Sequence, residues 1–221
     1  MSRWEIRIAT VIAAMALGLT PTATTAAEQP GLAIATLETL PVKGRAPKTG
    51  YTRDQFGQAW ADVDRNGCDT RNDILKRDLT SVIYKAKTRN CVVLSGTLLD
   101  RYSGESINFV RGNITSMEVQ IDHVVALSNA WQTGAFKLTA EQRKALANDP
   151  INLFAVKGRL NSQKGDGDAA TWLPPLKSFR CAYVAQQIAV KAKYSLWVVP
   201  PEKAAMLSIL AKCPTQKVPL S

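Results

Sequence analysis

The chain has 221 residues, of which 46% are hydrophobic, and its formal net charge at pH 7 is +10. This length suits one domain with a sizeable hydrophobic core, and no apolar run after the N-terminal segment is long enough to cross a membrane. The positive surplus favours a polyanionic partner, because lysines and arginines release counterions when they neutralise phosphates. Solubility and adhesion to an anionic cell wall are the alternatives, and charge alone does not separate them.

The N-terminal segment has the pattern of a secretory signal peptide. Arg3 and Arg7 give a positive start, residues 8–19 form an apolar run, and small residues follow. The alternative is a membrane anchor, but 12 apolar residues fall short of the roughly 20 that a membrane-spanning helix needs. We therefore expect residues 1–27 to be removed, with cleavage at Ala26 or Ala27, and a secreted chain whose charge is about +9.

Residues 28–50 contain three prolines and three glycines with little apolar periodicity. We interpret them as a flexible arm or linker. Ordered structure is then expected to start near Tyr51, and residues 51–221 are expected to form one domain. A short helix should open this domain, because Thr52 and Gln55 have the spacing of a capping box.

The middle of the chain predicts one helix and several strands. Residues 64–79 begin with turn-forming residues and continue with helical periodicity. Residues 91–99 and 107–110 are typical of two strands around a turn, and residues 117–127 of a partly buried strand. A short apolar run at residues 151–156 has the length of a further strand.

Helices are predicted between and after the later strands. Thr139 and Gln142 form a second capping-box pattern, which predicts a surface helix. Residues 178–194 form an amphipathic helical pattern, and residues 200–213 form another that begins with proline. Strands and helices that follow one another in this way indicate an α+β fold.

An even number of cysteines in an exported chain implies disulfide bonds. The four cysteines allow three pairings. We favour Cys68–Cys91 and Cys181–Cys213, because each pair joins segments that look like neighbours. A structural zinc site is not expected, because the sequence has no CxxC pair and its one histidine, His123, lies far from every cysteine.

Polar residues around His123 form an ordered pattern. An apolar, strand-like run ends in Asp122 and His123; Asn152 precedes the next apolar run, and Asn161 and Lys164 follow it. A lone histidine after an aspartate is more often structural than catalytic. The order in which these five polar residues occur favours a catalytic role for His123 over a structural one.

This order resembles the HNH endonucleases of the His-Me finger, or ββα-metal, class over residues 117–175. A broader resemblance is to exported HNH nucleases related to the nuclease part of GmrSD-type restriction enzymes. The segments that carry it are "NGCDTRNDIL", "IDHVVALSNAW", "NSQKGDGDAATWLPP" and "RCAYVAQQIAVKAKYSLW". The resemblance implies an α+β fold in which a ββα-metal core has a small antiparallel sheet and surrounding helices, stapled by disulfides.

The resemblance also implies roles for the patterned residues. His123 would be the general base that takes a proton from water, for which an imidazole pKa near 6.5 is suited. Asp122 and Asn161 would hold one Mg²⁺, or Mn²⁺ in its place, because both offer hard oxygen ligands. Asn152 would hydrogen-bond the loop that holds the base; an ordinary turn asparagine is the alternative.

Two basic residues are candidates for substrate binding. Lys164 would contact a phosphate, or be a solvated side chain. Arg71 would reach a phosphate, or belong to an internal Arg–Asp network beside the Cys68 disulfide.

The sequence therefore predicts a secreted, metal-dependent endonuclease that hydrolyses nucleic acid, with DNA as the expected partner and no obligate protein partner. The main alternative is a non-catalytic secreted protein that binds DNA or an anionic cell-wall polymer through charge. A hydrolase acting on another phosphodiester polymer would use the same site.

Overall fold

The computed structural model describes residue 1 and residues 31–219, so the predicted signal peptide lies outside the described residues apart from Met1. The α-helices are α1 (Ala33–Thr39), α2 (Thr70–Asp78), α3 (Leu127–Gln132), α4 (Ala140–Asn148), α5 (Gly158–Lys164), α6 (Arg180–Lys193) and α7 (Pro200–Leu210). The strands are β1 (Leu79–Tyr84), β2 (Val93–Leu99), β3 (Ser106–Val110), β4 (Val119–His123) and β5 (Leu153–Lys157). Short 3-10 turns are η1 (Arg53–Phe56), η2 (Thr115–Met117), η3 (Ala135–Lys137), η4 (Pro150–Asn152) and η5 (Lys177–Phe179).

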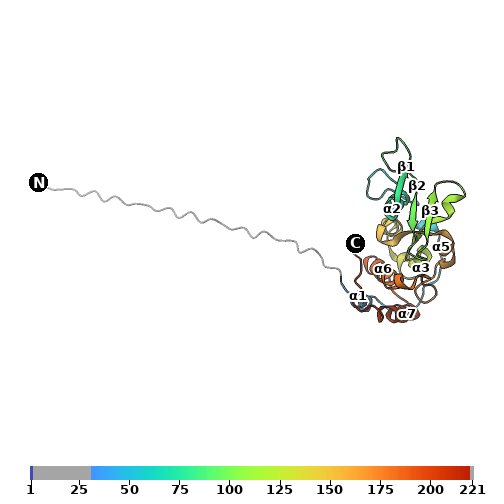
Figure 1. Cartoon of the computed structure of the whole chain (residues 1–221). Coiled ribbons are helices and arrows are strands. Elements are labelled where there is room, and N and C mark those ends of the chain that lie inside the picture. Colours follow the sequence, from blue (N-terminus) through green and yellow to red (C-terminus); the bar gives the residue numbers. More distant parts are fainter. Residues whose placement is uncertain (2–30, 220–221) are drawn as a thin grey trace.

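The strands form two antiparallel sheets, ordered β1–β2–β3 and β4–β5, which confirms the predicted α+β class. In Figure 1 the first sheet and α2 lie at one end of the molecule, and α1, α6 and α7 lie at the other. The strands predicted at 91–99 and 107–110 are β2 and β3. The sequence pattern did not predict β1, because the helical periodicity of residues 64–79 continues up to Leu79, where the structure starts a strand.

Strands β4 and β5 and helix α5 together position the candidate site. The two strands pair antiparallel, with His123 opposite Leu153, and α5 starts directly after β5 at Gly158. A Cβ atom at Gly158 would lie 1.9 Å from the Met117 carbonyl oxygen. Only glycine permits this approach, which fixes the start of α5 against the segment that leads into β4.

The expectation of a flexible arm over residues 28–50 is wrong for its described part. Residues 33–39 form α1, and the chain's hydrophobic core extends to Ala33, Leu37 and Leu40, which are buried against α6 and α7. These positions follow a helical spacing of three to four residues, and burying them outweighs the influence of the nearby prolines and glycines. Residues 31–50 therefore belong to the folded domain.

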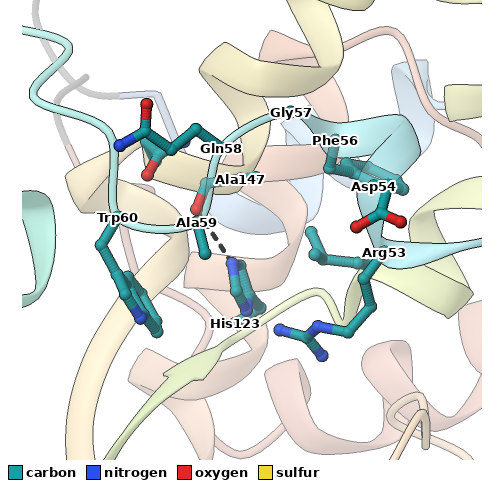
Figure 2. A pocket seen from close by; sticks show the side chains of 11 residues that line it. Arg53, Asp54, Phe56, Gly57, Gln58, Ala59, Trp60, His123 and Ala147 are labelled. Carbon is teal, nitrogen blue, oxygen red and sulfur yellow. Dashed lines mark hydrogen bonds between the residues drawn. The ribbon is translucent and has the colours of Figure 1, made fainter.

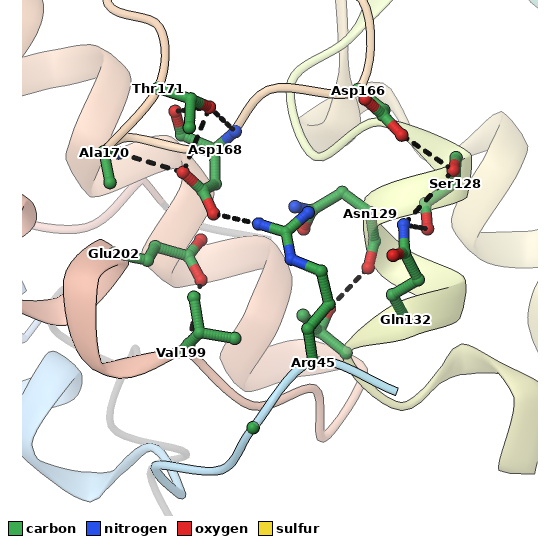
Figure 3. A network of polar contacts seen from close by, with 12 residues as sticks. Arg45, Ser128, Asn129, Gln132, Asp166, Asp168, Ala170, Thr171, Val199 and Glu202 are labelled. Atoms are coloured by element: carbon green, nitrogen blue, oxygen red, sulfur yellow. Dashed lines mark hydrogen bonds and ion pairs between the residues drawn. The ribbon is translucent and has the colours of Figure 1, made fainter. Parts of the chain in front are cut away.

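Residues 41–50 continue from α1 as an extended segment that is bound to the rest of the domain. The Trp197 indole donates a hydrogen bond to the Gly44 carbonyl oxygen at 3.0 Å. Arg45 forms an ion pair with the buried carboxylate of Asp168, which lies in the loop after α5, as Figure 3 shows. Residues 41–50 thus hold in place the loop that follows α5, the helix of the candidate site.

Both predicted disulfides are confirmed. Cys68 is bonded to Cys91, which joins the turn before α2 to the approach to β2, and Cys181 is bonded to Cys213, which joins α6 to the end of α7. Within the part of the chain that the structure describes, no helix is long and apolar enough to span a lipid bilayer.

Candidate active site

Three side chains that the sequence pattern singled out line the same cavity. Asp122 and His123 reach it from the end of β4, and Asn161 reaches it from α5. The cavity has a volume of about 90 Å³, and Arg53 lines it as well. The structure therefore brings the expected proton acceptor and the two expected oxygen ligands to one place.

His123 is held in one tautomer by a backbone contact. Its Nε2 lies 2.9 Å from the Ala147 carbonyl oxygen, as Figure 2 shows. A carbonyl oxygen only accepts hydrogen bonds, so Nε2 carries the proton and Nδ1 keeps a free lone pair.

Burial lowers the pKa of His123 from 6.5 to about 4, with a smaller lowering by the charges of Arg53 and Lys164 and an opposing effect of the Ala147 carbonyl. The imidazole is therefore neutral at pH 7, and its Nδ1 can accept a proton.

Trp60 covers the imidazole on one face. The two rings are stacked, with 5.9 Å between their centroids and an angle of 16° between their planes. A second cavity, of about 100 Å³, opens on this side of His123 and is also lined by Arg53 and Phe56 (Figure 2). The stack limits the rotation of the imidazole.

The carboxylate of Asp122 is buried and has two donors. Lys164 Nζ lies 2.9 Å from Oδ1, and the Tyr102 hydroxyl donates to Oδ2 at 2.5 Å. Burial raises the pKa of Asp122, and the charge of Lys164 and the Tyr102 hydroxyl oppose this shift. Each carboxylate oxygen keeps a second lone pair, which is the donor that a cation would need.

The structure corrects the expected position of Lys164. We expected its ammonium group to contact a phosphate or to be solvated, but the side chain is fully buried and forms an ion pair with Asp122. Its Nζ also donates to the His123 carbonyl oxygen at 2.7 Å. Lys164 thus ties α5 to the end of β4, because a buried ammonium needs a charged or polar partner.

Arg71 is not among the residues that line either cavity beside His123. It lies on α2, and its Nη2 donates to the Val119 carbonyl oxygen at 3.3 Å. A contact between Arg71 and substrate stays a prediction.

Asn152 is buried beside the loop that follows β4. Its Oδ1 accepts from the Val125 backbone N–H at 2.8 Å, and its Nδ2 donates to the Leu146 carbonyl oxygen at 3.2 Å. These bonds join the loop after His123 to the last turn of α4, near the Ala147 carbonyl that fixes the imidazole. This geometry matches the expected contact with the loop, and a role in catalysis remains a prediction.

The donors present fit a hard cation with few protein ligands. Within residues 31–219, no three or more His, Cys, Asp or Glu side chains gather as a metal site. Asp122 and Asn161 nevertheless supply a carboxylate and an amide oxygen beside one cavity, and Asn161 is oriented by donating from Nδ2 to Gln120 Oε1 at 2.9 Å. Mg²⁺ keeps several waters and takes only one or two protein oxygens at many sites, so this pair suits it.

Sequence reasoning missed three side chains at this site: Arg53, Trp60 and Tyr102. All three precede residues 117–175, so the ββα-metal pattern gave no reason to select them. Each reaches the site through the tertiary fold: Arg53 from η1, Trp60 from the loop between η1 and α2, and Tyr102 from the β2–β3 turn. Trp60 alone carried a weak signal, an aromatic residue in a polar and glycine-containing segment.

Comparison with known proteins identifies the family. Residues 69–209 match the family described as GmrSD restriction endonucleases, C-terminal domain. A protein of Arthroderma benhamiae, described as an uncharacterized secreted protein, is 38% identical over 179 residues, which cover 80% of this chain and 82% of that protein. No solved structure matches the chain. Because the matched segment spans more than half of the sequence, the chain belongs to the family of GmrSD restriction endonuclease C-terminal domains.

Proposed function

We propose that the protein is a secreted, metal-dependent endonuclease of the HNH type that hydrolyses phosphodiester bonds in nucleic acid, with DNA as the expected substrate. The observation that carries this proposal is the convergence of Asp122, His123 and Asn161 on one cavity. The family membership and the secreted relative support it from outside the site.

His123 would act as the general base. Its Nε2 proton is bonded to the Ala147 carbonyl, so Nδ1 is the nitrogen that takes a proton from the attacking water. The resulting hydroxide adds to phosphorus, and the bond to the leaving oxygen breaks. Trp60 and Asn152 keep the imidazole in place during this transfer, one by stacking on it and the other by fixing the loop that follows it.

Asp122 and Asn161 would hold one Mg²⁺ or Mn²⁺ ion through their oxygen atoms. The bound ion supplies a Lewis acid that polarises the phosphate and stabilises charge on the leaving oxygen. Lys164 would hold the Asp122 carboxylate in position through their ion pair, which replaces the phosphate contact predicted for it from the sequence.

Cleavage of supercoiled plasmid DNA by the purified mature protein tests this proposal. We expect nicking and linearisation with Mg²⁺, no cleavage with EDTA, and loss of cleavage in His123→Ala, with the far-ultraviolet circular dichroism unchanged. Arg89→Ala, which removes an exposed charge from the β1–β2 turn, is the control and should cleave like the wild type. Equal cleavage by wild type and His123→Ala would contradict the proposal.

The alternative, a non-catalytic binder of DNA or an anionic wall polymer, is supported only by the charge of +10. It predicts salt-sensitive DNA binding that EDTA and His123→Ala leave unchanged, without cleavage. The same purified proteins distinguish the two functions in one binding titration.

A further inference from the structure

We propose that Arg53 is a catalytic residue that binds the phosphate under attack, supplied by a segment before the family-matched region. This inference rests on the proposed nuclease function and deepens it. Arg53 lines both cavities beside His123, the one that Asp122 and Asn161 also line and the one that Trp60 also lines. Figure 2 shows its side chain extending toward His123.

The backbone that carries Arg53 is anchored, so the guanidinium is presented from a fixed base. Arg53 opens η1, whose last residue, Phe56, is buried against Trp131 and Leu146 in a hydrophobic cluster. From α4, Arg143 donates to the Gln55 carbonyl oxygen at 2.7 Å. The turn therefore packs on the same helix whose Ala147 carbonyl holds His123.

Two other cations near the site are already bonded to protein partners. Lys164 is buried against Asp122, and Arg143 is bonded to Gln55. Among the described residues, Arg53 has no ion pair, and it is the one permanently charged cation that lines the cavity of Asp122, His123 and Asn161. Arg53 is therefore the group at this site that remains free to bind an anion.

Guanidinium chemistry suits this task. Arginine is always charged and offers a planar fork of donors that matches two phosphate oxygens, and its weak hydration lowers the cost of transferring it to a partly enclosed site. Negative charge on phosphate oxygens grows as hydroxide adds, so a cation at this position stabilises the transition state more than the ground state. Arg53→Lys would keep the charge and lose the fork.

With Arg53, the proposed active site includes a residue outside the segment that matches the family. The matched segment starts at residue 69, whereas Arg53 belongs to the preceding segment. Residues 41–50 bind that segment to the domain, through Arg45 and Asp168 among other contacts. The N-terminal part of the chain would thus complete the active site as well as the hydrophobic core.

The test compares wild type, Arg53→Ala, Arg53→Lys and the control Arg89→Ala in two measurements. The first is the steady-state rate of cleavage of a short DNA duplex with Mg²⁺. We expect Arg53→Ala to lower kcat/KM by about 10- to 100-fold, as for a lost charge-assisted hydrogen bond, with a smaller loss for Arg53→Lys. Arg89→Ala should stay within about twofold, because it removes the same charge from an exposed position.

The second measurement is binding of thymidine 3′,5′-bisphosphate without metal, followed through the arginine Nε–Hε signals in a ¹⁵N–¹H nuclear magnetic resonance spectrum. The signal that is missing in Arg53→Lys belongs to Arg53. We expect this signal to shift during the titration, and we expect the affinity to fall about tenfold in Arg53→Ala but not in Arg89→Ala.

The two measurements separate this inference from the proposed function. If the wild type cleaves DNA and Arg53→Ala cleaves or binds like Arg89→Ala, the role of Arg53 is overturned and the nuclease function stands. If the wild type does not cleave and the bisphosphate still binds at Arg53, the nuclease function fails and the phosphate site stands. A bisphosphate that leaves the Arg53 signal unshifted overturns the inference in either case.

Discussion

At the scale of single residues, the site is a buried polar cluster whose members fix one another. Lys164 bonds both the Asp122 carboxylate and the His123 carbonyl oxygen, and Tyr102 bonds the second carboxylate oxygen. Removing one member leaves a charge in a region of low dielectric without its partner, which costs more than the loss of a surface contact. Stability and activity are therefore linked at these positions.

Lys164→Met should lower the free energy of unfolding by about 3–5 kcal/mol, because it leaves the buried carboxylate of Asp122 unpaired. The double variant with Asp122→Asn should recover part of this loss. Lys48→Met is the control: its ion pair with Asp166 has side chains that are 57% and 42% exposed, so its loss should cost less than about 1 kcal/mol. Urea unfolding measures all four proteins, and equal losses for Lys164→Met and Lys48→Met would refute the prediction.

The pKa of His123 predicts how stability depends on pH in the metal-free protein. The folded imidazole titrates at about 4 and the unfolded one near 6.5, so the unfolded state binds more protons between these values. The neutral His123 therefore contributes up to about 3 kcal/mol to the free energy of unfolding. This contribution is fully present above pH 6.5 and is lost as the pH falls toward 4.

Urea unfolding in EDTA at pH 7 and pH 4.5 measures this contribution, with His123→Gln as the variant that does not titrate. The wild type should lose more stability than the variant over this range. A parallel loss in the two proteins would show that His123 has an ordinary pKa.

At the scale of elements, the sequence predicts those parts whose signals are local. The capping box at Thr139 and Gln142 is present at the start of α4, and the amphipathic patterns give α6 and α7. β1 was missed because the helical periodicity of residues 64–79 runs up to the first residue of the strand, and the pairing with β2 that overrides it forms only in the folded chain. The convergence of Asp122, His123 and Asn161 was predicted from the resemblance of their ordered series to the HNH endonucleases. The contact of Arg53 depends instead on how η1 packs on α4.

Gly158 is the element-scale position most sensitive to substitution. Gly158→Ala would place a Cβ atom 1.9 Å from the Met117 carbonyl oxygen, so β4 and α5 would have to separate. We expect a loss of about 2 kcal/mol or more in unfolding free energy and weaker plasmid cleavage. Gly44→Ala is the control, because no atom lies within 4 Å of its Cβ position. Equal stability of the two variants in urea would contradict this account of the β4–α5 junction.

At the scale of the whole molecule, residues 31–50 complete the hydrophobic core and lead to the candidate site. Helix α1 covers α6 and α7, and residues 41–50 lead from it to η1 beside the candidate site. This role could not be predicted from the sequence, because prolines and glycines interrupt the segment. Its few apolar residues are recognisable as core residues only once they pack against α6 and α7. Two disulfides add covalent links at both ends of the molecule in Figure 1.

The packing of α1 predicts a stability difference between two leucines. Leu37 is fully buried, so Leu37→Ala should lower the free energy of unfolding by about 2–5 kcal/mol. Leu32, which is 43% exposed, is the matched control, and Leu32→Ala should cost about 0.5 kcal/mol or less. Thermal unfolding gives both values, and a neutral Leu37→Ala would restore the view of residues 31–50 as an arm without a structural role.

The location of a bound metal ion tests the central claim most directly. Anomalous diffraction from crystals soaked in Mn²⁺ should place one ion within about 2.0–2.2 Å of an Asp122 carboxylate oxygen and of Asn161 Oδ1. The ion should also lie on the cavity side of His123, with Nδ1 free to face a water. A Mn²⁺ ion bound elsewhere, together with plasmid cleavage that persists in EDTA, would contradict a metal-dependent centre at the end of β4.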